Sequence, residues 1–204
     1  MEQEVLDNHR LYEQRVEFYR GFGYDLEKER DFILDAAMPV SGKILEIGTG
    51  KGHFALALAK RGFQFVSIDI SADEQRIAQL NLRYFGLEKK AELRLENAEA
   101  LSFPDKSFDV IFSVNVFHHL QNPLKVLDET VRLLTAAGKI VLSDFTDKGL
   151  EIINACHTRE HRTHDHCNHR LDEARDYFLN KGFSVKETRS AVQHVIAATA
   201  PDRV

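Results

Sequence analysis

The feature that most constrains this chain is a glycine-rich turn between an apolar run and a helical pattern. Ile44 to Ile47 has the short apolar character of a buried parallel strand, and Gly48, Gly50 and Gly52 follow at alternate positions. Apolar residues then recur at helical spacing, at Phe54, Ala55, Leu58 and Ala59. A strand, a glycine turn and a helix let a small anionic or zwitterionic ligand approach the backbone, where amide N–H groups and the helix dipole favour a negative group. The sequence therefore predicts a nucleotide-type site at this turn.

Strand and helix patterns alternate along the rest of the chain. Further strands are predicted at 63–69, 91–95, 108–114 and 139–145, with helices between them and Gly138 in the turn before the last strand. A helix at 171–180 precedes two strands, 183–188 and 191–199, whose short connection permits only antiparallel pairing. We therefore predict an α/β fold with a doubly wound seven-stranded sheet, mostly parallel with a C-terminal antiparallel hairpin, and helices on both faces.

Two predicted helices, at 5–22 and 26–38, precede the first strand. We expect a single domain in which residues 1–39 form a helical lid over a core of residues 40–204. Tyr12, Tyr19 and Tyr24 are the lid residues that can reach the site, and Tyr19 is the candidate for the substrate pocket. Plain packing is the alternative for this stripe, since apolar helix faces usually serve that purpose.

Composition excludes several classes of protein. The net charge is -5 and Lys and Arg are interspersed with acids, so no nucleic-acid partner is expected. Two cysteines are too few for a disulfide framework, and the acidic N-terminus does not resemble a signal peptide. No apolar run approaches the roughly 20 residues of a membrane span. A cytoplasmic protein without a membrane partner is expected, and the oligomeric state is open.

The spacing of glycines and polar residues reduces the range of ligands that the turn can bind. A dinucleotide fingerprint has glycines at G-x-G-x-x-G, and its third glycine falls on His53 here. Glu46 sits inside the strand end just before the turn, and Asp69 closes the next strand, where it can accept hydrogen bonds from ribose hydroxyls. In the loop after the third strand, Asn97 can meet an adenine edge while Ala98 leaves room for the ring.

Taken together, five segments resemble, in order and spacing, the motifs of class I S-adenosylmethionine-dependent methyltransferases of the small-molecule type. They are residues 45–52, 67–71, 97–105, 108–120 and 129–140. Any one of these motifs is weak, but five in sequence over roughly residues 40 to 145 are specific. The resemblance implies a Rossmann-like core at 40–204 and transfer of a methyl group from S-adenosylmethionine to a small-molecule acceptor.

The resemblance also implies roles for individual residues. Gly48, Thr49 and Gly50 would cradle the methionine moiety, with Glu46 nearby. The remaining predicted cofactor contacts are Asp69 at the ribose, Ile70, Asn97 and Ala98 at the adenine, and Asn115 beside the amino group or sulfonium. For Asp69 the alternative is a helix N-cap or a surface acid.

His118 and His119 follow the fourth core strand and are the candidate catalytic residues. Histidine suits proton transfer near neutral pH, and an alcohol nucleophile would need such help whereas a thiolate or carbanion would not. The alternative is that the pair merely packs or caps the following helix.

Five of the ten histidines fall in residues 156–169. If this stretch is helical, His157, His161 and His164 share one face and can bind a transition metal, with Asp165, Cys156 or Cys167 completing the set. Alternatively, it is a polar loop whose histidines bind the acceptor or nothing, and in an intermediate interpretation His161 and His164 line the substrate pocket.

Two other functional classes remain open from the sequence. One is a non-catalytic module that senses S-adenosylmethionine or a metal through residues 156–169. The other is an NAD-dependent oxidoreductase, which His53 at the third-glycine position disfavours. The acceptor itself is not indicated by any motif.

Overall fold

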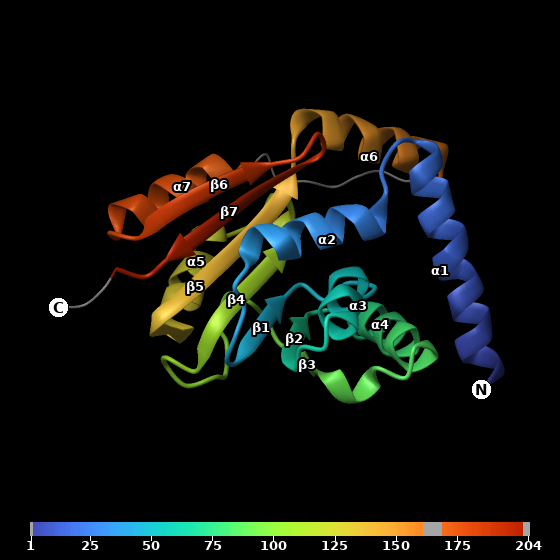
Figure 1. The fold of residues 1–204 in the computed structure, drawn as a ribbon, viewed down its shortest axis with the longest axis horizontal. Coiled ribbons are helices and arrows are strands. Elements are labelled where there is room, and N and C mark those ends of the chain that lie inside the picture. The colour runs from blue at the N-terminus through green and yellow to red at the C-terminus, as the bar shows by residue number, and fades with distance from the viewer. Residues whose placement is uncertain (1, 161–168, 202–204) are drawn as a thin grey trace.

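The computed structural model describes residues 2–160 and 169–201, and within them seven strands form one sheet. The order across the sheet is β3-β2-β1-β4-β5-β7-β6 (Figure 1). The strands are β1 (Ile44–Ile47), β2 (Phe65–Asp69), β3 (Ala91–Leu95), β4 (Phe108–Val114), β5 (Leu134–Phe145), β6 (Ser184–Arg189) and β7 (Gln193–Thr199). Strands β1 to β5 pair in parallel, and β7 pairs antiparallel with both β5 and β6. The predicted fold class is confirmed.

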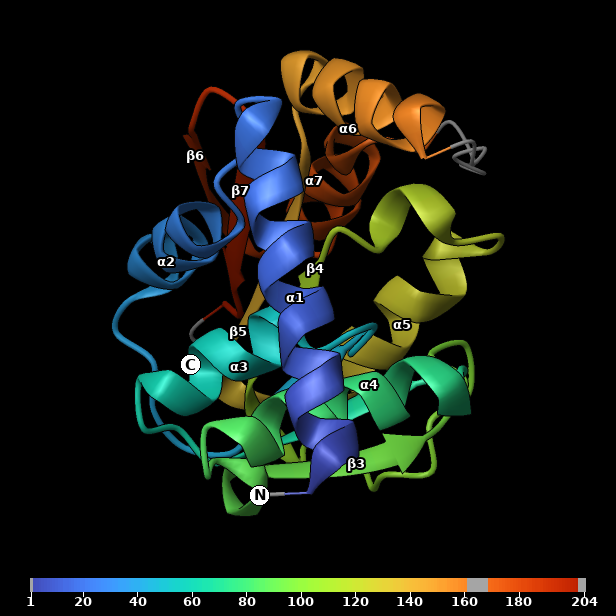
Figure 2. The ribbon, with the colours of Figure 1, turned by 90° about the vertical axis from the view of Figure 1, so that its right-hand side faces the viewer.

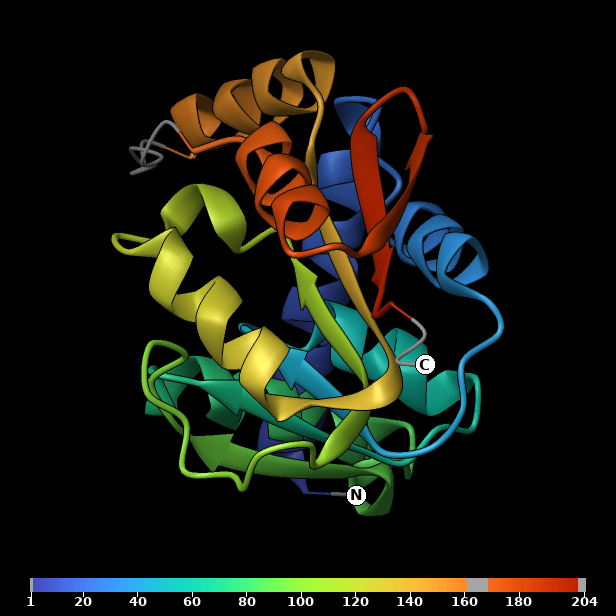
Figure 3. The same ribbon diagram turned by 90° about the vertical axis from the view of Figure 1, so that its left-hand side faces the viewer.

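Helices cover both faces of this sheet. They are α1 (Gln3–Gly21), α2 (Leu26–Ala37), α3 (His53–Lys60), α4 (Ala72–Tyr84), α5 (Pro123–Leu133), α6 (Asp147–Arg159) and α7 (Leu171–Asn180), with the short 3-10 helices η1 (Glu88–Lys90) and η2 (Phe117–His119). Helices α2, α3 and α4 share one apolar core with the sheet, and α5 and α7 share the other. In the view of Figure 3, α5 in yellow and α2 in blue lie on opposite sides of the strands.

The alternation of side chains along β4 explains the two cores. Val110 and Phe112 belong to the core with α2 and α3, whereas Ile111 between them belongs to the core with α5 and α7. Because successive residues of a strand point to opposite faces, a central strand that is buried on both sides carries apolar residues on both of its faces. This is the pattern that the sequence displays.

Helices α1 and α6 occupy a different position, beyond the carboxyl ends of the central strands (Figure 1). A third apolar cluster joins them, with Val16 and Tyr19 from α1 against Ile153 and Cys156 from α6. The N-terminal half of α1 packs on α4, where the ring of His9 stacks on that of Tyr84 with centroids 3.4 Å apart. Figure 2 shows α1 crossing in front of the sheet edge at which the strands end. Helix α1 therefore covers this edge, whereas α2 packs on a face of the sheet, and the action of residues 1–39 as a lid stays a prediction.

Two features differ from the sequence interpretation. Gly138 lies inside β5 and not in a turn before it, because β5 begins at Leu134, directly after α5. The pairing of β5 with β4 shifts between Phe108, which pairs with Leu134, and Val110, which pairs with Lys139, so Gly138 lies in this irregular part of the strand. In addition, residues 147–159 form helix α6, which the sequence analysis did not assign. Within the described ranges, no helix is long and apolar enough to span a membrane.

Candidate functional site

The glycine turn connects β1 to α3 through three residues with positive φ. The φ angles are 86° at Gly48, 48° at Gly50 and 78° at Gly52. A Cβ atom on Gly48 would lie 2.2 Å from Val116 Cγ2, and one on Gly52 would lie 2.7 Å from Ala78 Cβ on α4. Glycine is therefore required at 48 and 52 for both its conformation and its lack of a side chain.

The backbone amides of this turn are mostly engaged within the protein. Gly48 N and Thr49 N both donate to Ile68 O on β2, at 2.8 and 3.0 Å, and Gly52 N donates to Thr49 O at 2.9 Å. Gly50 N donates to Asp69 Oδ2 at 2.7 Å. The expectation of bare amides that favour a negative group is wrong for these four positions. The turn instead offers close approach to a ligand that needs no phosphate cradle.

Asp69 ends β2 and its carboxylate is held on two sides. Besides the bond from Gly50 N, its Oδ1 accepts from Ser71 N at 2.9 Å. Ser71, not Asp69, caps α4, since the Ser71 hydroxyl accepts from Glu74 N at 3.2 Å. The capping alternative for Asp69 is thereby excluded, and its carboxylate is fixed at the edge of a cavity.

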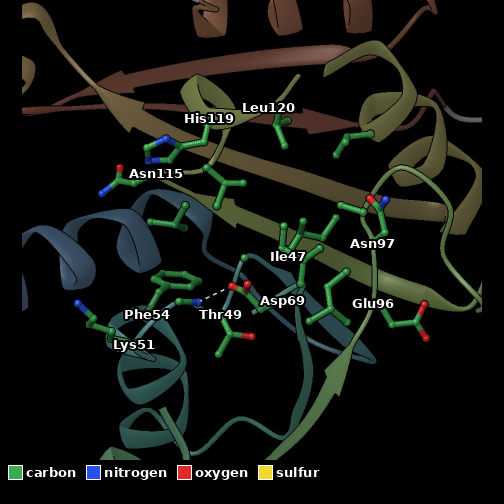
Figure 4. A pocket seen from close by; sticks show the side chains of 18 of the residues that line it. Ile47, Thr49, Lys51, Phe54, Asp69, Glu96, Asn97, Asn115, His119 and Leu120 are labelled. Carbon is green, nitrogen blue, oxygen red and sulfur yellow. Dashed lines mark hydrogen bonds between the residues drawn. The ribbon is translucent and has the colours of Figure 1, made fainter. Parts of the chain in front are cut away.

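A cavity of about 620 Å³ opens at the carboxyl ends of β1, β2, β3 and β4. Of the predicted cofactor contacts, it is lined by Gly48, Thr49, Gly50, Asp69, Ile70, Asn97, Ala98 and Asn115. Figure 4 shows Asn97 and Glu96 at one end of the cavity, Asn115, His119 and Lys51 at the other, and Asp69 between them. The structure thus brings these residues around one space, and their individual roles stay predictions.

Glu46 is placed differently, since it does not line this cavity. Its side chain is buried behind the turn, where Oε2 accepts a hydrogen bond from Ser67 Oγ at 2.5 Å and Oε1 has no partner within the described residues. Burial raises the pKa of this carboxyl to about 8. A protonated carboxyl is tolerated in an apolar setting, which explains how a buried acid exists here without direct contact with a ligand.

A second cavity, of about 220 Å³, adjoins the first on the side covered by α1 and α6. Its walls include Tyr19 from α1, Tyr24, Phe145, and Ile153 from α6. The two cavities share the lining residues Arg30, Lys51, His53, Asn115 and His119. Tyr19 thus lies beside the larger cavity, and its role in a substrate pocket stays a prediction.

Asn115 stands where the two cavities meet. It follows β4 with a φ of 56°, a left-handed conformation that asparagine tolerates better than most residues. Its Nδ2 lies 3.5 Å from Tyr24 Oη, while its Oδ1 is buried without a hydrogen-bond partner in the described part of the chain. A buried carbonyl oxygen in this position is suited to accept a hydrogen bond from a ligand.

The two candidate catalytic histidines belong to η2. His118 is buried, and its Nδ1 lies 2.6 Å from Asp144 Oδ1 on β5. The Asp144 carboxylate also accepts from His118 N at 3.0 Å, which fixes the position of the ring. His118 lines the second cavity, and His119 lines both.

The histidine-rich stretch is only partly described. His157 is on α6 and lines the second cavity, and Cys156 is buried in the cluster between α1 and α6. His161, His164, Asp165 and Cys167 lie outside the described residues. In the part of the chain that the structure covers, no group of three or more potential ligands could hold a metal ion. The metal site at His157, His161 and His164 is therefore untested and stays a prediction.

Sequence reasoning missed two residues of this region. Arg30 on α2 lines both cavities, and Asp144 holds His118. No motif marks either residue, because each acts through contacts with distant parts of the chain. The weak signal for Asp144 was an acid inside the otherwise apolar end of a core strand.

Comparisons with known proteins agree with this geometry. Residues 45–142 match a family described as "Methyltransferase domain". A ubiquinone biosynthesis O-methyltransferase of Ruegeria sp. (strain TM1040) is 32% identical over 118 residues, which are 57% of this chain and 46% of that protein. The chain thus spans about half the length, or less, of the first curated relatives it matches.

Solved structures share the fold. A protein from Pyrococcus horikoshii OT3 superposes with a TM-score of 0.70 at 20% identity, over 93% of this chain and 92% of that one. A SAM-dependent methyltransferase from Aquifex aeolicus gives a TM-score of 0.66 at 20% identity, over 84% of this chain and 89% of that one. At this identity the likeness concerns the fold alone.

Proposed function

We propose that this chain acts as a class I S-adenosylmethionine-dependent methyltransferase, which transfers a methyl group from S-adenosylmethionine to a small-molecule acceptor. The observation that carries the proposal is the pair of adjoining cavities that meet at Asn115 and His119. Methyl transfer needs a donor and an acceptor held in contact and shielded from water, and two spaces with a common boundary meet this need.

On the cofactor side, we assign the larger cavity to S-adenosylmethionine. The carboxylate of Asp69 would accept hydrogen bonds from the ribose hydroxyls, and Asn97 and Ala98 would face the adenine. The unpartnered Oδ1 of Asn115 would accept a hydrogen bond from the amino group. The engaged amides of the glycine turn favour this ligand over a dinucleotide, whose pyrophosphate uses free amides at a helix N-terminus.

The cofactor supplies a methyl group that its sulfonium already activates. The chain's own residues would therefore serve mainly to align the acceptor and to receive its proton. His118 is the residue we assign to this proton transfer, because donation of its Nδ1–H to Asp144 makes Nε2 the basic nitrogen. His119, at the boundary of the cavities, would contact both ligands.

The relatives support a small-molecule acceptor without naming it. They include a ubiquinone biosynthesis O-methyltransferase, a 27-O-demethylrifamycin SV methyltransferase and an ajmaline N-methyltransferase, whose names refer to small molecules of unrelated structure. Because these proteins differ so widely in acceptor, we transfer only the size class to this chain. The second cavity, at about 220 Å³, fits a compact acceptor.

The proposal is tested by incubating the protein with S-adenosylmethionine that carries a labelled methyl group and with a whole-cell extract, which is then fractionated into small molecules, protein and nucleic acid. We expect label to appear in one or a few small molecules in a protein-dependent manner. Asn115→Leu should reduce this incorporation by about tenfold or more, since it removes the amide at the boundary of the cavities. The control is Arg83→Gln. Arg83 is exposed in the last turn of α4 and pairs with Glu2, and its substitution should not change the incorporation of label. Label confined to nucleic acid or protein would contradict the assignment of the acceptor.

A further inference from the structure

Asn81 is a buried side chain of α4 that contacts the glycine turn, although it lines neither of the two cavities. Only 2% of the residue is exposed. Its Nδ2 donates a hydrogen bond to Lys51 O at 2.8 Å, and its Oδ1 accepts one from Asn8 Nδ2 on α1 at 2.7 Å. A backbone carbonyl only accepts hydrogen bonds, so the amide nitrogen of Asn81 must face Lys51. One buried amide therefore links the N-terminal helix to the glycine turn.

The peptide group between Lys51 and Gly52 is the part of the turn that this amide holds. The backbone is left-handed on both sides of Lys51, with φ angles of 48° at Gly50 and 78° at Gly52. The N–H of this peptide donates to Thr49 O at 2.9 Å, which is a contact within the turn itself. The bond from Asn81 to its C=O joins it instead to another element, α4. Because glycine restricts the backbone least of all residues, the orientation of this peptide depends on that external contact.

Helix α4 supports the turn in a second way. A Cβ atom on Gly52 would lie 2.7 Å from Ala78 Cβ, so the backbone of the turn packs directly on α4. Residues i and i+3 of a helix share one face, as Ala78 and Asn81 do. This face of α4 thus provides both the surface on which the turn rests and the amide that fixes its peptide.

Asn8 makes this contact depend on α1. An asparagine amide has two alternative orientations, related by a half rotation about its last side-chain torsion. Donation by Asn8 selects the orientation in which Nδ2 of Asn81 faces Lys51 O, whereas the other would place two acceptors against each other. Helix α1 also contacts the far end of the turn, where the ring of Tyr12 stacks on that of His53 with centroids 5.4 Å apart.

Lys51 lies at one end of the larger cavity. Figure 4 shows it at the same end as Asn115 and His119, whereas Asn97 and Glu96 lie at the other end. With the adenine at Asn97, the amino-acid part of S-adenosylmethionine lies at the end that contains Lys51. A contact that orders the Lys51 peptide therefore acts on this part of the cofactor and not on its adenosine part.

We propose that Asn81 is a positioning residue for the amino-acid part of the cofactor, and that Asn8 makes its action depend on α1. This inference rests on the proposed function of the larger cavity. Preorganisation is the physical reason, because a peptide that is held before the cofactor arrives loses less conformational entropy on binding. Loss of either amide leaves the groups that contact the cofactor in place but frees the Lys51 peptide. The affinity then falls although neither asparagine touches the ligand.

Calorimetric titration of the full chain with two ligands tests this proposal. S-adenosylhomocysteine carries the amino-acid part, and 5′-methylthioadenosine lacks it. Asn81→Leu is similar in size but forms no hydrogen bond. It should bind S-adenosylhomocysteine about tenfold more weakly than the wild type does, and 5′-methylthioadenosine within about twofold of the wild-type affinity. Unchanged affinity for S-adenosylhomocysteine, or an equal loss for both ligands, would overturn the proposal.

Asn8→Ala tests the contribution of α1 at a less buried position, and it decides the matter if Asn81→Leu does not fold. This variant should bind S-adenosylhomocysteine about three- to tenfold more weakly, with unchanged affinity for 5′-methylthioadenosine. Wild-type affinity for both ligands, or a parallel loss, would contradict the proposal.

The matched control is Glu4→Ala, which breaks the ion pair of Glu4 with Arg76, another contact between α1 and α4. It should leave both affinities unchanged. A loss as large as that of Asn8→Ala would mean that the docking of α1, and not the chain of amides, supports the cofactor, and the proposal would fail. Failure of the wild type to bind S-adenosylhomocysteine would instead contradict the proposed function, so the two failures are distinct.

Discussion

His118 Nδ1 and Asp144 Oδ1 lie 2.6 Å apart in a buried pair that joins η2 to the end of β5. The same carboxylate accepts hydrogen bonds from the backbone N–H groups of His118 and Phe145. The Asp144 side chain therefore cannot rotate away from the His118 ring without losing three hydrogen bonds. This arrangement holds one imidazole in one tautomer beside the second cavity.

Asp144→Asn should therefore change the tautomer of His118, because an amide NH₂ facing Nδ1 can only donate to it. We expect nitrogen-15 NMR to show Nδ1 protonated in the wild type and Nε2 protonated in the variant. Methyl transfer at saturating substrate should fall by about 10²-fold if the acceptor needs a base.

The control for Asp144 uses another histidine–carboxylate pair. His194 Nε2 lies 2.6 Å from Glu187 Oε2, and neither residue lines the two cavities. Glu187→Gln should leave the transfer rate unchanged. Protonation of His118 at Nε2 in the wild type would contradict its assignment as the proton acceptor.

Gly52→Ala should destabilise the protein through contact as well as conformation. A Cβ atom there would lie 2.7 Å from Ala78 Cβ and 2.9 Å from Ala78 Cα, which belongs to the backbone of α4 and cannot easily move. Gly62 has a similar φ of 87° but nothing within 4 Å of the added atom, so Gly62→Ala isolates the conformational cost.

We expect Gly62→Ala to lower the free energy of unfolding by about 1–2 kcal/mol, and Gly52→Ala to lower it by about 1–3 kcal/mol more. Urea denaturation of both variants measures the difference. Equal losses would mean that the packing of α3 against α4 does not require a glycine at position 52.

The raised pKa of Glu46 predicts that the free energy of unfolding depends on pH, and it fixes the sign of this dependence. The ordinary value is 4.5 and the folded value is about 8, so between these pH values the folded state binds more protons than the unfolded state. The contribution of Glu46 to the free energy of unfolding is then fully present below about pH 4.5 and is lost as the pH rises toward 8.

Glu46→Gln removes this titration while keeping a neutral polar group. Relative to wild type, the variant should gain stability progressively from pH 5 to pH 8, as measured by urea denaturation at several pH values. Glu88→Gln, which changes an exposed residue of η1, serves as the control and should show no such trend. A constant difference between Glu46→Gln and wild type across this range would refute the raised pKa.

Local patterns explain why the fold could be predicted so fully. The run from Phe108 to Val114 is apolar except at Asp109 and Ser113, and the turn at Gly48 combines a motif and a special backbone conformation within a few residues. By contrast, α6 was missed because its sequence is polar and its apolar contacts, such as Ile153, face α1 rather than the main core. Gly138 was misplaced because β5 begins directly after α5, without a separate turn.

The candidate site also contains residues that the sequence predicts and residues that only the structure reveals. The positions carried by motifs, such as Asp69 and Asn97, do line the larger cavity. The resemblance places Glu46 near the methionine moiety, whereas the structure buries its side chain outside the lining of the cavity, with a pKa raised by burial. The place of Arg30 at the cavities is visible only in three dimensions, since it depends on the hydrogen bond of Arg30 to Tyr24, which Gln193 on β7 holds in turn.

The most direct test of the whole account is calorimetric titration of the protein with S-adenosylhomocysteine and, separately, with NADH. We expect one molecule of S-adenosylhomocysteine to bind per chain, with an affinity about 10–100-fold weaker in Asp69→Ala, because a charged hydrogen-bond acceptor is worth about 1.5–3 kcal/mol. Asp73→Ala, on the exposed first turn of α4, should bind as the wild type does. NADH should not bind. Absence of S-adenosylhomocysteine binding at millimolar concentration, or tight binding of NADH in its place, would contradict the assignment of the glycine turn.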